Sequence, residues 1–338
     1  MGTTEAVAVV VIEVGRHELR AIWREGVRQT RAVSWAGDGH PALLLARALA
    51  TLLASVPGKQ PLLVLACQDR FGGHWETLIG LRRVGEGLGV PLRVACVDGR
   101  GWWLADALAA GGSPARFALP RAPGLVALAR ECSDNKAVAV VDLGASSAEW
   151  VRIGKARAGA GPALARLRDG SLTWIGLLDT PVDAVLRRFR GWPVVPRHAR
   201  IRAASRWLAL PPLPVAGVSE RRELADELAA ALALDPDGML RAFPELPDPI
   251  GSLARAVVRG AIGRLVRAWR PLGCPGDEVW ICGLGGEGLA RPALRALGRP
   301  CAGNLEAVLG LLPGYGVAAG WLNLEETRHR GASAGPRA

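Results

Sequence analysis

The sequence predicts an α/β protein built from two similar halves. Strand-like apolar runs cluster at 6–35 and 137–160, and helical stretches and one later strand follow each cluster. Each cluster also contains a strand-like run closed by an acid and a nearby glycine, at Glu13-Val14-Gly15 and at Asp142-Leu143-Gly144. Because this similarity spans whole halves and has no short period, we expect two lobes with a ligand in the cleft where the acid-Gly turns converge.

Length, net charge and cysteine content limit the classes of protein to which this chain can belong. The 338 residues suffice for one large domain or two medium ones, and half of them are hydrophobic. The net charge of +11 comes from scattered arginines, with only three lysines, which disfavours a nucleic-acid partner. Six widely spaced cysteines without a CxxC pair suit buried thiols in a reducing compartment. The run Val7–Ile12 is too short for a signal segment or a membrane span, so we expect a cytoplasmic protein.

The first half begins with three candidate strands. The pattern then alternates between helix and strand, with Pro41 in the first turn of a helix. The expected strands are 6–14, 16–24, 27–35, 61–66 and 91–97, and the expected helices are 41–56, 73–88, 103–110 and 122–132.

The second half opens with a buried strand at Ala137–Val141 and a returning strand through Trp150–Ile153. Further helices are expected at Pro181–Arg190, 196–208, 220–234, 250–269, 289–297, 305–312 and 317–326, with one strand at Val279–Cys282. The chain thus divides into an N-terminal lobe at 1–135, a C-terminal lobe at 136–326 with a helical insertion at about 181–272, and a disordered tail at 327–338.

The turn after Ala137–Val141 has the composition of a phosphate cradle. Its residues are Asp142, Gly144, Ala145, Ser146 and Ser147. Glycine lets backbone N–H groups approach phosphate, the hydroxyls donate, and the carboxylate can hold Mg²⁺. An ordinary tight hairpin with Asp and Gly as turn formers fits the same residues.

A second glycine-rich turn, Gly283–Gly288, matches G-x-G-x-x-G between a strand and a helix. The dinucleotide interpretation needs a βαβ unit and an acid about twenty residues on. Glu306 lies near that distance, but no convincing strand precedes it. We therefore prefer a turn at Gly283, Gly285 and Gly286 that lets a nucleotide, or the facing domain, pack closely on the backbone.

Together these motifs resemble the actin-like ATPase superfamily, which has a two-lobed, ribonuclease H-like α/β fold with a central cleft. Within it they resemble the hydantoinase A/oxoprolinase-related family, in its tetrahydromethanopterin-linked one-carbon branch that includes the methanofuran-biosynthesis synthase. The matches are Glu13–Arg16 for the first phosphate motif, Asp142–Glu149 for the second, Gly170–Val182 for the family's G-E-L-x-Y-x-G-x-x-R-T-P-V, and Gly283-Leu284-Gly285 for its G-L-G-x-x-L-A. They span residues 6–325.

The resemblance implies Mg²⁺ held by Asp142 and Glu13, and a nucleotide or diphosphate bound by the glycine turns, Gly15 included. Other residues would line the cleft, namely Arg16, Asp69, Glu149, Gly176, Asp179 and Thr180. For the synthase branch it implies a transferase that joins an aminomethylfuran diphosphate to a tyramine phenol with loss of pyrophosphate.

The sequence departs from the family where the chemistry is expected. Glu13 replaces an Asp, Arg16 replaces a glycine, and Asp179 replaces an arginine, which reverses a charge beside the expected anion. With these changes, the sequence supports two hypotheses almost equally: a divergent synthase and a catalytically inactive paralogue. It favours the synthase slightly. A small-molecule kinase or ATPase of the same fold is third. The corresponding partners are a small phosphorylated molecule or a pathway protein.

Overall fold

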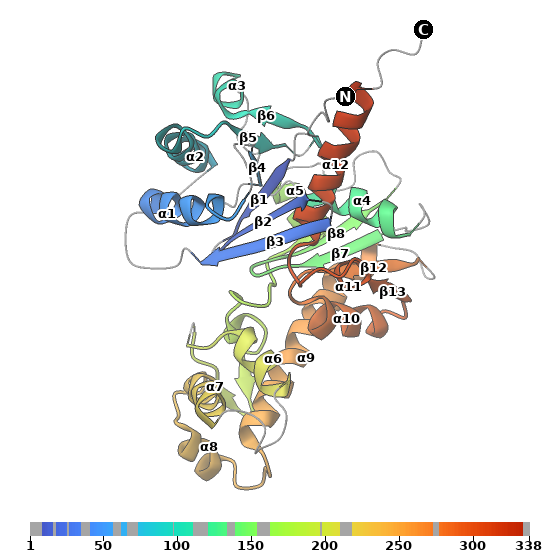
Figure 1. Cartoon of the computed structure of the whole chain (residues 1–338). Coiled ribbons are helices and arrows are strands. Elements are labelled where there is room, and N and C mark those ends of the chain that lie inside the picture. Colours follow the sequence, from blue (N-terminus) through green and yellow to red (C-terminus); the bar gives the residue numbers. More distant parts are fainter. Residues whose placement is uncertain are drawn as a thin grey trace. The chain divides into compact units, whose positions relative to one another are not determined.

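The computed structural model describes residues 9–15, 18–25, 27–34, 41–56, 62–65, 74–96, 98–110, 121–133, 139–153, 163–196, 198–209, 218–272 and 277–333. The chain forms two compact units (Figure 1). Unit 1 comprises Met1–Ala137, Val151–Ala163 and Leu305–Ala338, and unit 2 comprises Val138–Trp150 and Leu164–Asn304. Residues 305–326, which the sequence-based division placed in the second lobe, therefore belong to unit 1.

Unit 1 contains a six-stranded sheet in the order β3-β2-β1-β4-β5-β6. The strands are β1 (Val10–Val14), β2 (Glu18–Glu25), β3 (Val27–Ser34), β4 (Leu62–Leu65), β5 (Leu92–Ala95) and β6 (Gly101–Trp103). β1, β4 and β5 are parallel, whereas β2 is antiparallel to both β1 and β3. The central strands are the apolar, β-branched runs that the sequence predicts.

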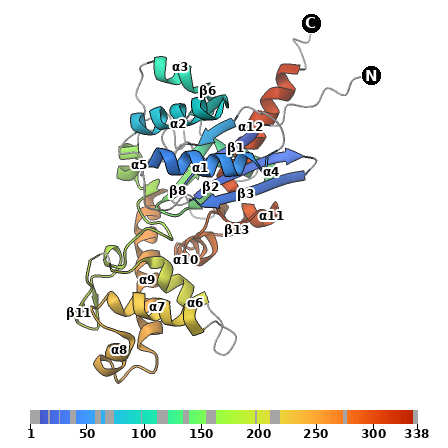
Figure 2. The same ribbon diagram turned by 60° about the vertical axis from the view of Figure 1, so that its left-hand side comes forward.

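Helices pack on both faces of this sheet (Figures 1 and 2). The helices that contact its strands are α1 (Pro41–Leu53), α2 (His74–Leu88), α3 (Leu104–Ala109) and α12 (Gly316–Ser333), while α4 (Arg121–Cys132) packs on α12 and α11 (Leu305–Val308) packs on α4. Val10, Ile12 and Val14 share one core with α1 and α2. Since side chains alternate along a strand, the buried Val11 faces the opposite side, where α12 packs on β1 and β2.

Unit 2 contains a five-stranded sheet in the order β13-β12-β7-β8-β9. Its strands are β7 (Ala139–Leu143), β8 (Ala148–Arg152, whose last two residues begin the Val151–Ala163 segment of unit 1), β9 (Leu172–Thr173), β12 (Val279–Cys282) and β13 (Cys301–Asn304). β12 is parallel to β7 and β13, and a four-residue turn joins β7 to β8, a connection that requires an antiparallel pair. Each sheet thus has a meander on one side of its first strand and two parallel strands on the other, and the sheet of unit 1 carries the antiparallel β6 as an additional edge strand. This arrangement confirms the predicted two-sheet, ribonuclease H-like α/β class.

The remainder of unit 2 is mostly helical (Figure 1). It contains α5 (Ala163–Asp169), the 3-10 turns η2 (Val182–Ala184) and η3 (Arg270–Leu272), β10 (Arg188–Phe189), β11 (Trp192–Pro193), α6 (Ile201–Ala209), α7 (Val218–Ala230), α8 (Pro236–Ala242), α9 (Pro249–Trp269), the π-helix η4 (Gly286–Ala290) and α10 (Arg291–Ala296). The apolar stripe of α9 is buried, and α9 packs against α6, α7 and α8.

Three expectations differ from the structure. The helix expected at Pro181–Arg190 is wrong: only one 3-10 turn forms before the β10–β11 hairpin, where Arg190 (φ 49°) and Gly191 (φ 89°) make a two-residue turn of the type I′ kind. A strand, β13, does precede Glu306, although its residues have low β-propensity. Finally, α12 continues to Ser333, so the first part of the expected tail is helical, and 334–338 lie outside the described residues.

No helix in the described part of the chain is both long and apolar enough to cross a membrane.

Candidate functional site

The turn after β7 closes as a tight hairpin in unit 2. The Gly144 N–H donates to the Ser147 carbonyl at 2.9 Å, and Ser147 is buried. Gly144 therefore uses its amide within the turn, so one of the donors expected for phosphate is already engaged.

A loop from unit 2, Gly176–Thr180, packs directly on this turn. The Leu177 N–H donates to the Gly144 carbonyl at 3.0 Å, and the amides of Leu178 and Asp179 donate to the Ala145 carbonyl at 2.9 and 3.0 Å. A Cβ at Gly176 would overlap the Ala145 backbone, so only glycine allows this approach. The segment Gly170–Val182, which matches the resembled family, thus contains a loop that packs over the Gly144–Ser147 turn.

The carboxylate of Asp179 engages the hydroxyl group that the turn would offer to a phosphate. The Ser146 hydroxyl donates to Asp179 Oδ2. The loop is held in place by Arg200 Nη1, which donates to the Asp179 carbonyl at 3.0 Å, and by Thr180 Oγ1, which accepts from the Gly176 amide at 2.8 Å. An internal anion therefore lies where the sequence predicts a bound phosphate.

Asp142 lies at the end of β7, opposite Cys282 of β12, and is only 4% exposed. Its Oδ1 accepts from the Cys282 thiol at 3.6 Å. Gly283, in the left-handed region at φ 84°, lies so close that an added Cβ would overlap the same oxygen. Asp142 is thus packed among groups of its own sheet.

The glycine-rich turn after β12 also uses its amides internally. Gly285 N–H donates to the Leu143 carbonyl at 2.9 Å, and Gly286 N–H donates to the Gly283 carbonyl at 3.0 Å. A Cβ at Gly285 would overlap the Leu143 side chain. The close approach that the second glycine of a dinucleotide fingerprint offers to pyrophosphate is therefore taken by Leu143.

Glu306, the candidate ribose ligand of that fingerprint, lies in unit 1 and is 1% exposed. Its Oε1 accepts from the amides of Gly314 and Gly316, each at 2.7 Å. Its carboxylate stabilises the turn before α12, so Glu306 does not serve as the acid that a dinucleotide site needs after the parallel β12–α10–β13 arrangement.

Glu13, the predicted second metal ligand, lies in unit 1 between two guanidinium groups. Arg20 Nη1 is 3.8 Å and Arg121 Nη2 is 4.0 Å from its carboxylate. Burial lowers the pKa of Arg20, but the carboxylates of Glu13 and Glu18 outweigh burial and raise this pKa above its ordinary value. Gly15 donates its amide to the Glu18 carbonyl at 3.0 Å, so this first motif is also closed locally.

Glu149, expected to line the cleft, is fully buried and forms an ion pair with Arg166 of α5. A ligand cannot reach this carboxylate without opening the core of unit 2. Its place in the structure is that of a buried charge pair.

The residues present do not fit a magnesium ion. Two arginines already balance the charge of Glu13, and Asp142 lies against a thiol, whereas Mg²⁺ prefers oxygen ligands. Within the described residues, no group of three or more His, Cys, Asp or Glu side chains could hold a metal ion.

The structure brings together many of the predicted site residues in unit 2, with Asp142, Ser146, Gly176, Asp179, Thr180 and Gly283 around the end of β7. Glu13 and Gly15 belong to unit 1. Arg16 and Asp69 lie outside the described residues. Sequence reasoning missed Arg20, Arg121, Arg200 and Cys282. None of them is part of a local motif: Arg20, Arg121 and Cys282 lie on regular elements, and Arg200 directly precedes α6.

Several solved structures are similar to this chain over nearly its whole length. A hexokinase from Schistosoma mansoni complexed with glucose has a TM-score of 0.47 and 12% identity, covering 94% of this chain and 86% of that one. An activator of the 2-hydroxyisocaproyl-CoA dehydratase from Clostridium difficile with bound ADPNP has a TM-score of 0.46 and 8% identity, covering 98% of both chains. A ROK hexokinase from Thermus thermophilus has a TM-score of 0.39 and 15% identity, covering 94% and 99%.

No protein-family model and no curated protein matches the chain in sequence. The TM-scores of these three structures are below 0.5, so these likenesses carry no argument about function. The chain's own sheets show a mixed α/β protein with two sheets that share the relative order of their first five strands.

Proposed function

We propose that this chain is a non-catalytic member of the actin-like fold class that acts as a protein partner, or assembly subunit, of an enzyme pathway. The observation that carries the proposal is the hydrogen bond from the Ser146 hydroxyl to the Asp179 carboxylate. It favours the paralogue over the synthase, which the sequence alone put slightly ahead.

Charge and donor supply both oppose phosphate at this turn. The amides of Gly144, Gly285 and Gly286 and the hydroxyl of Ser146 all donate within unit 2. A unit negative charge about 4 Å from Asp179 is repelled by about 4 kcal/mol at an effective dielectric constant of about 20. That energy corresponds to a roughly thousandfold loss of affinity.

A basic hairpin supports the partner role. Arg187, Arg188 and Arg190 are exposed on the β10–β11 hairpin, and none of them has an ion-pair partner among the residues described. Trp192, 41% exposed, lies on the same hairpin. Arginine beside tryptophan is the composition of strong contact points in protein interfaces, so the surface suits an acidic partner.

Co-purification from the native source tests the partner role. We expect one stoichiometric partner that is lost when Arg188→Glu and Arg190→Glu are combined, and retained by Asp142→Asn because Asp142 is buried away from any protein surface. The combination of Asp237→Lys and Glu245→Lys, at exposed positions of the same unit, controls for altered charge. Recovery of no partner, or loss of the partner in Asp142→Asn, would count against the proposal.

A nucleotide-binding kinase or ATPase is the second candidate, favoured by the position of Asp142 near the end of β7, separated from the Gly144–Ser147 turn only by Leu143. Nucleotide hydrolysis by the purified chain that disappears in Asp142→Asn would support the kinase or ATPase candidate and contradict the non-catalytic role. The methanofuran-type synthase of the tetrahydromethanopterin-linked pathway, which would displace pyrophosphate from a diphosphate substrate, is a separate candidate.

A further inference from the structure

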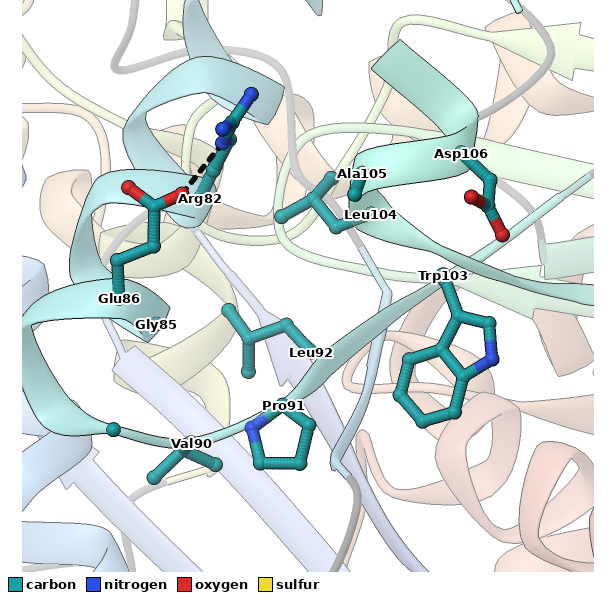
Figure 3. A pocket seen from close by; sticks show the side chains of 11 residues that line it. Arg82, Gly85, Glu86, Val90, Pro91, Leu92, Trp103, Leu104, Ala105 and Asp106 are labelled. Carbon is teal, nitrogen blue, oxygen red and sulfur yellow. Dashed lines mark hydrogen bonds and ion pairs between the residues drawn. The ribbon is translucent and has the colours of Figure 1, made fainter. Parts of the chain in front are cut away.

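A cavity of about 470 Å³ opens on unit 1, away from the residues discussed so far (Figure 3). It lies between the end of α2, the start of β5 and the junction of β6 with α3. Its volume is in the range of small-molecule sites.

One wall of the cavity is fixed by the way α2 ends. The Val90 amide donates to the Gly85 carbonyl at 3.0 Å and the Gly89 amide to the Glu86 carbonyl at 3.2 Å, with Gly89 at φ 63°. This is the Schellman pattern of a helix C-terminus. A Cβ at Gly85 would lie 2.8 Å from Leu92, so glycine lets the helix lie directly on β5. The wall is therefore preformed.

Trp103 forms the opposite wall. It ends β6, directly precedes the first residue of α3, and is 48% exposed. The guanidinium of Arg93 lies 5.9 Å from its ring centroid, and Arg93 is itself held by Glu325 at 2.5 Å. The indole is thus fixed while half of it remains open to a ligand.

The charged side chains that line the cavity carry a net negative charge. Figure 3 shows the Glu86 carboxylate on one side and the Asp106 carboxylate on the other, beside Trp103, with Pro91 and Leu92 between. Arg82 Nε donates to Glu86 at 2.7 Å, so these two charges cancel. Asp106 has no side-chain partner in the described part of the chain, which leaves one carboxylate available beside an aromatic ring.

We propose that this cavity binds a small organic cation. Its ammonium group pairs with Asp106 and its apolar or aromatic body packs on Trp103 and the Pro91–Leu92 floor. A free arylalkylamine and the side chain of a lysine in a peptide both carry this chemistry. The inference is independent of the proposed partner role, because it concerns another surface and another ligand class.

The test is a titration of the full chain at neutral pH, followed by NMR, with 2-phenylethylamine, 2-phenylethanol and 3-phenylpropionate. We expect saturable binding of the amine, at least about tenfold weaker binding of the alcohol, and none of the carboxylate. N-acetyl-lysine amide and a lysine-containing peptide, added in parallel, show whether a free amine or a peptide side chain is preferred.

Asp106→Asn keeps the shape of the side chain, and we expect it to weaken amine binding about tenfold and bring it level with the alcohol. Trp103→Ala is expected to abolish binding of both. Asp237→Asn and Trp174→Ala, at exposed positions in unit 2, are the matched controls and should bind as the wild type does. Thermal midpoints establish that each variant is folded. Equal binding of the three ligands, an unchanged amine affinity in Asp106→Asn, or no saturation at about 10 mM would overturn the proposal.

Discussion

Asp179 changes the chemistry of the Gly144–Ser147 turn by two separate effects. Its negative charge, where the resembled family has arginine, is visible in the sequence and predicts repulsion of an anion. Its acceptance of the Ser146 hydroxyl is not visible there, because the two residues lie 33 positions apart and meet only through the loop contacts of Gly176. At this scale, the sequence indicates the reversed charge, and only the fold shows that the donor is occupied.

The buried pair Glu149–Arg166 gives a direct test of residue-scale energetics. Their side chains are 0% and 5% exposed. We expect Glu149→Gln to lower the free energy of unfolding by about 3–5 kcal/mol, because it leaves a buried guanidinium without its counter-charge. Urea denaturation measures this.

The double variant Glu149→Leu with Arg166→Met is the control for that experiment. It removes both charges, so we expect its stability to be near that of the wild type. A single variant as stable as the wild type would mean that the pair does not contribute as a buried ion pair.

Cys132 provides a pH-dependent prediction. Burial, followed by the neighbouring Glu131 carboxylate, raises the pKa of its thiol from 9.0 to about 11, against a smaller opposing effect of Arg28. Between these values the unfolded chain loses the thiol proton while the folded chain keeps it. This group's contribution to the free energy of unfolding therefore falls as pH rises through that window.

Alkylation of Cys132 by iodoacetamide, followed by peptide mass spectrometry, measures the shift. We expect little reaction at pH 8 in the folded protein and a rise in rate towards pH 11, with Glu131→Gln moving the rise to lower pH. An unchanged pH dependence in Glu131→Gln would contradict the assigned cause.

Helix α9 carries a matched pair of glycines for a test at the scale of one element. A Cβ at Gly260 would lie 2.5 Å from the Val185 carbonyl oxygen, whereas a Cβ at Gly263 meets nothing within 4 Å. We expect Gly260→Ala to destabilise unit 2 by about 1–3 kcal/mol through overpacking. Gly263→Ala should stabilise it by up to about 1 kcal/mol through helix propensity. Shifts of the same sign in thermal unfolding would contradict this packing.

Among the elements, long periodic segments were predictable and short ones were not. β1, β4, β7 and β12 appear in the sequence as apolar runs, and α9 as an amphipathic helix with Asp248 and Pro249 at its start. The strands β9, β10 and β11 have two residues each, so pairing in the folded chain decides them. Pro181 suggested a helix, but the turn at Arg190-Gly191 reverses the chain within a few residues.

For the whole molecule, the repeat of one sheet order in two units follows from the repeated strand, acid-Gly turn and strand pattern in the sequence. The candidate site was only partly predictable. Several of the candidate residues lie around the end of β7 in unit 2, but the amides of Gly144, Gly285 and Gly286 and the hydroxyl of Ser146 donate to groups of the same unit. A motif shows that a turn has the composition to bind phosphate, and the packing around it decides whether those groups are available.

Calorimetric titration with pyrophosphate and ATP, each with and without Mg²⁺, is the most direct measurement. It compares the wild type, Asp179→Arg and the charge-matched control Asp237→Arg. We expect no binding heat for the wild type and the control. We expect Asp179→Arg to bind pyrophosphate, because that change frees the Ser146 hydroxyl and supplies a cation. Magnesium-dependent binding of about −8 kcal/mol by the wild type would contradict the closure of the turn by Asp179.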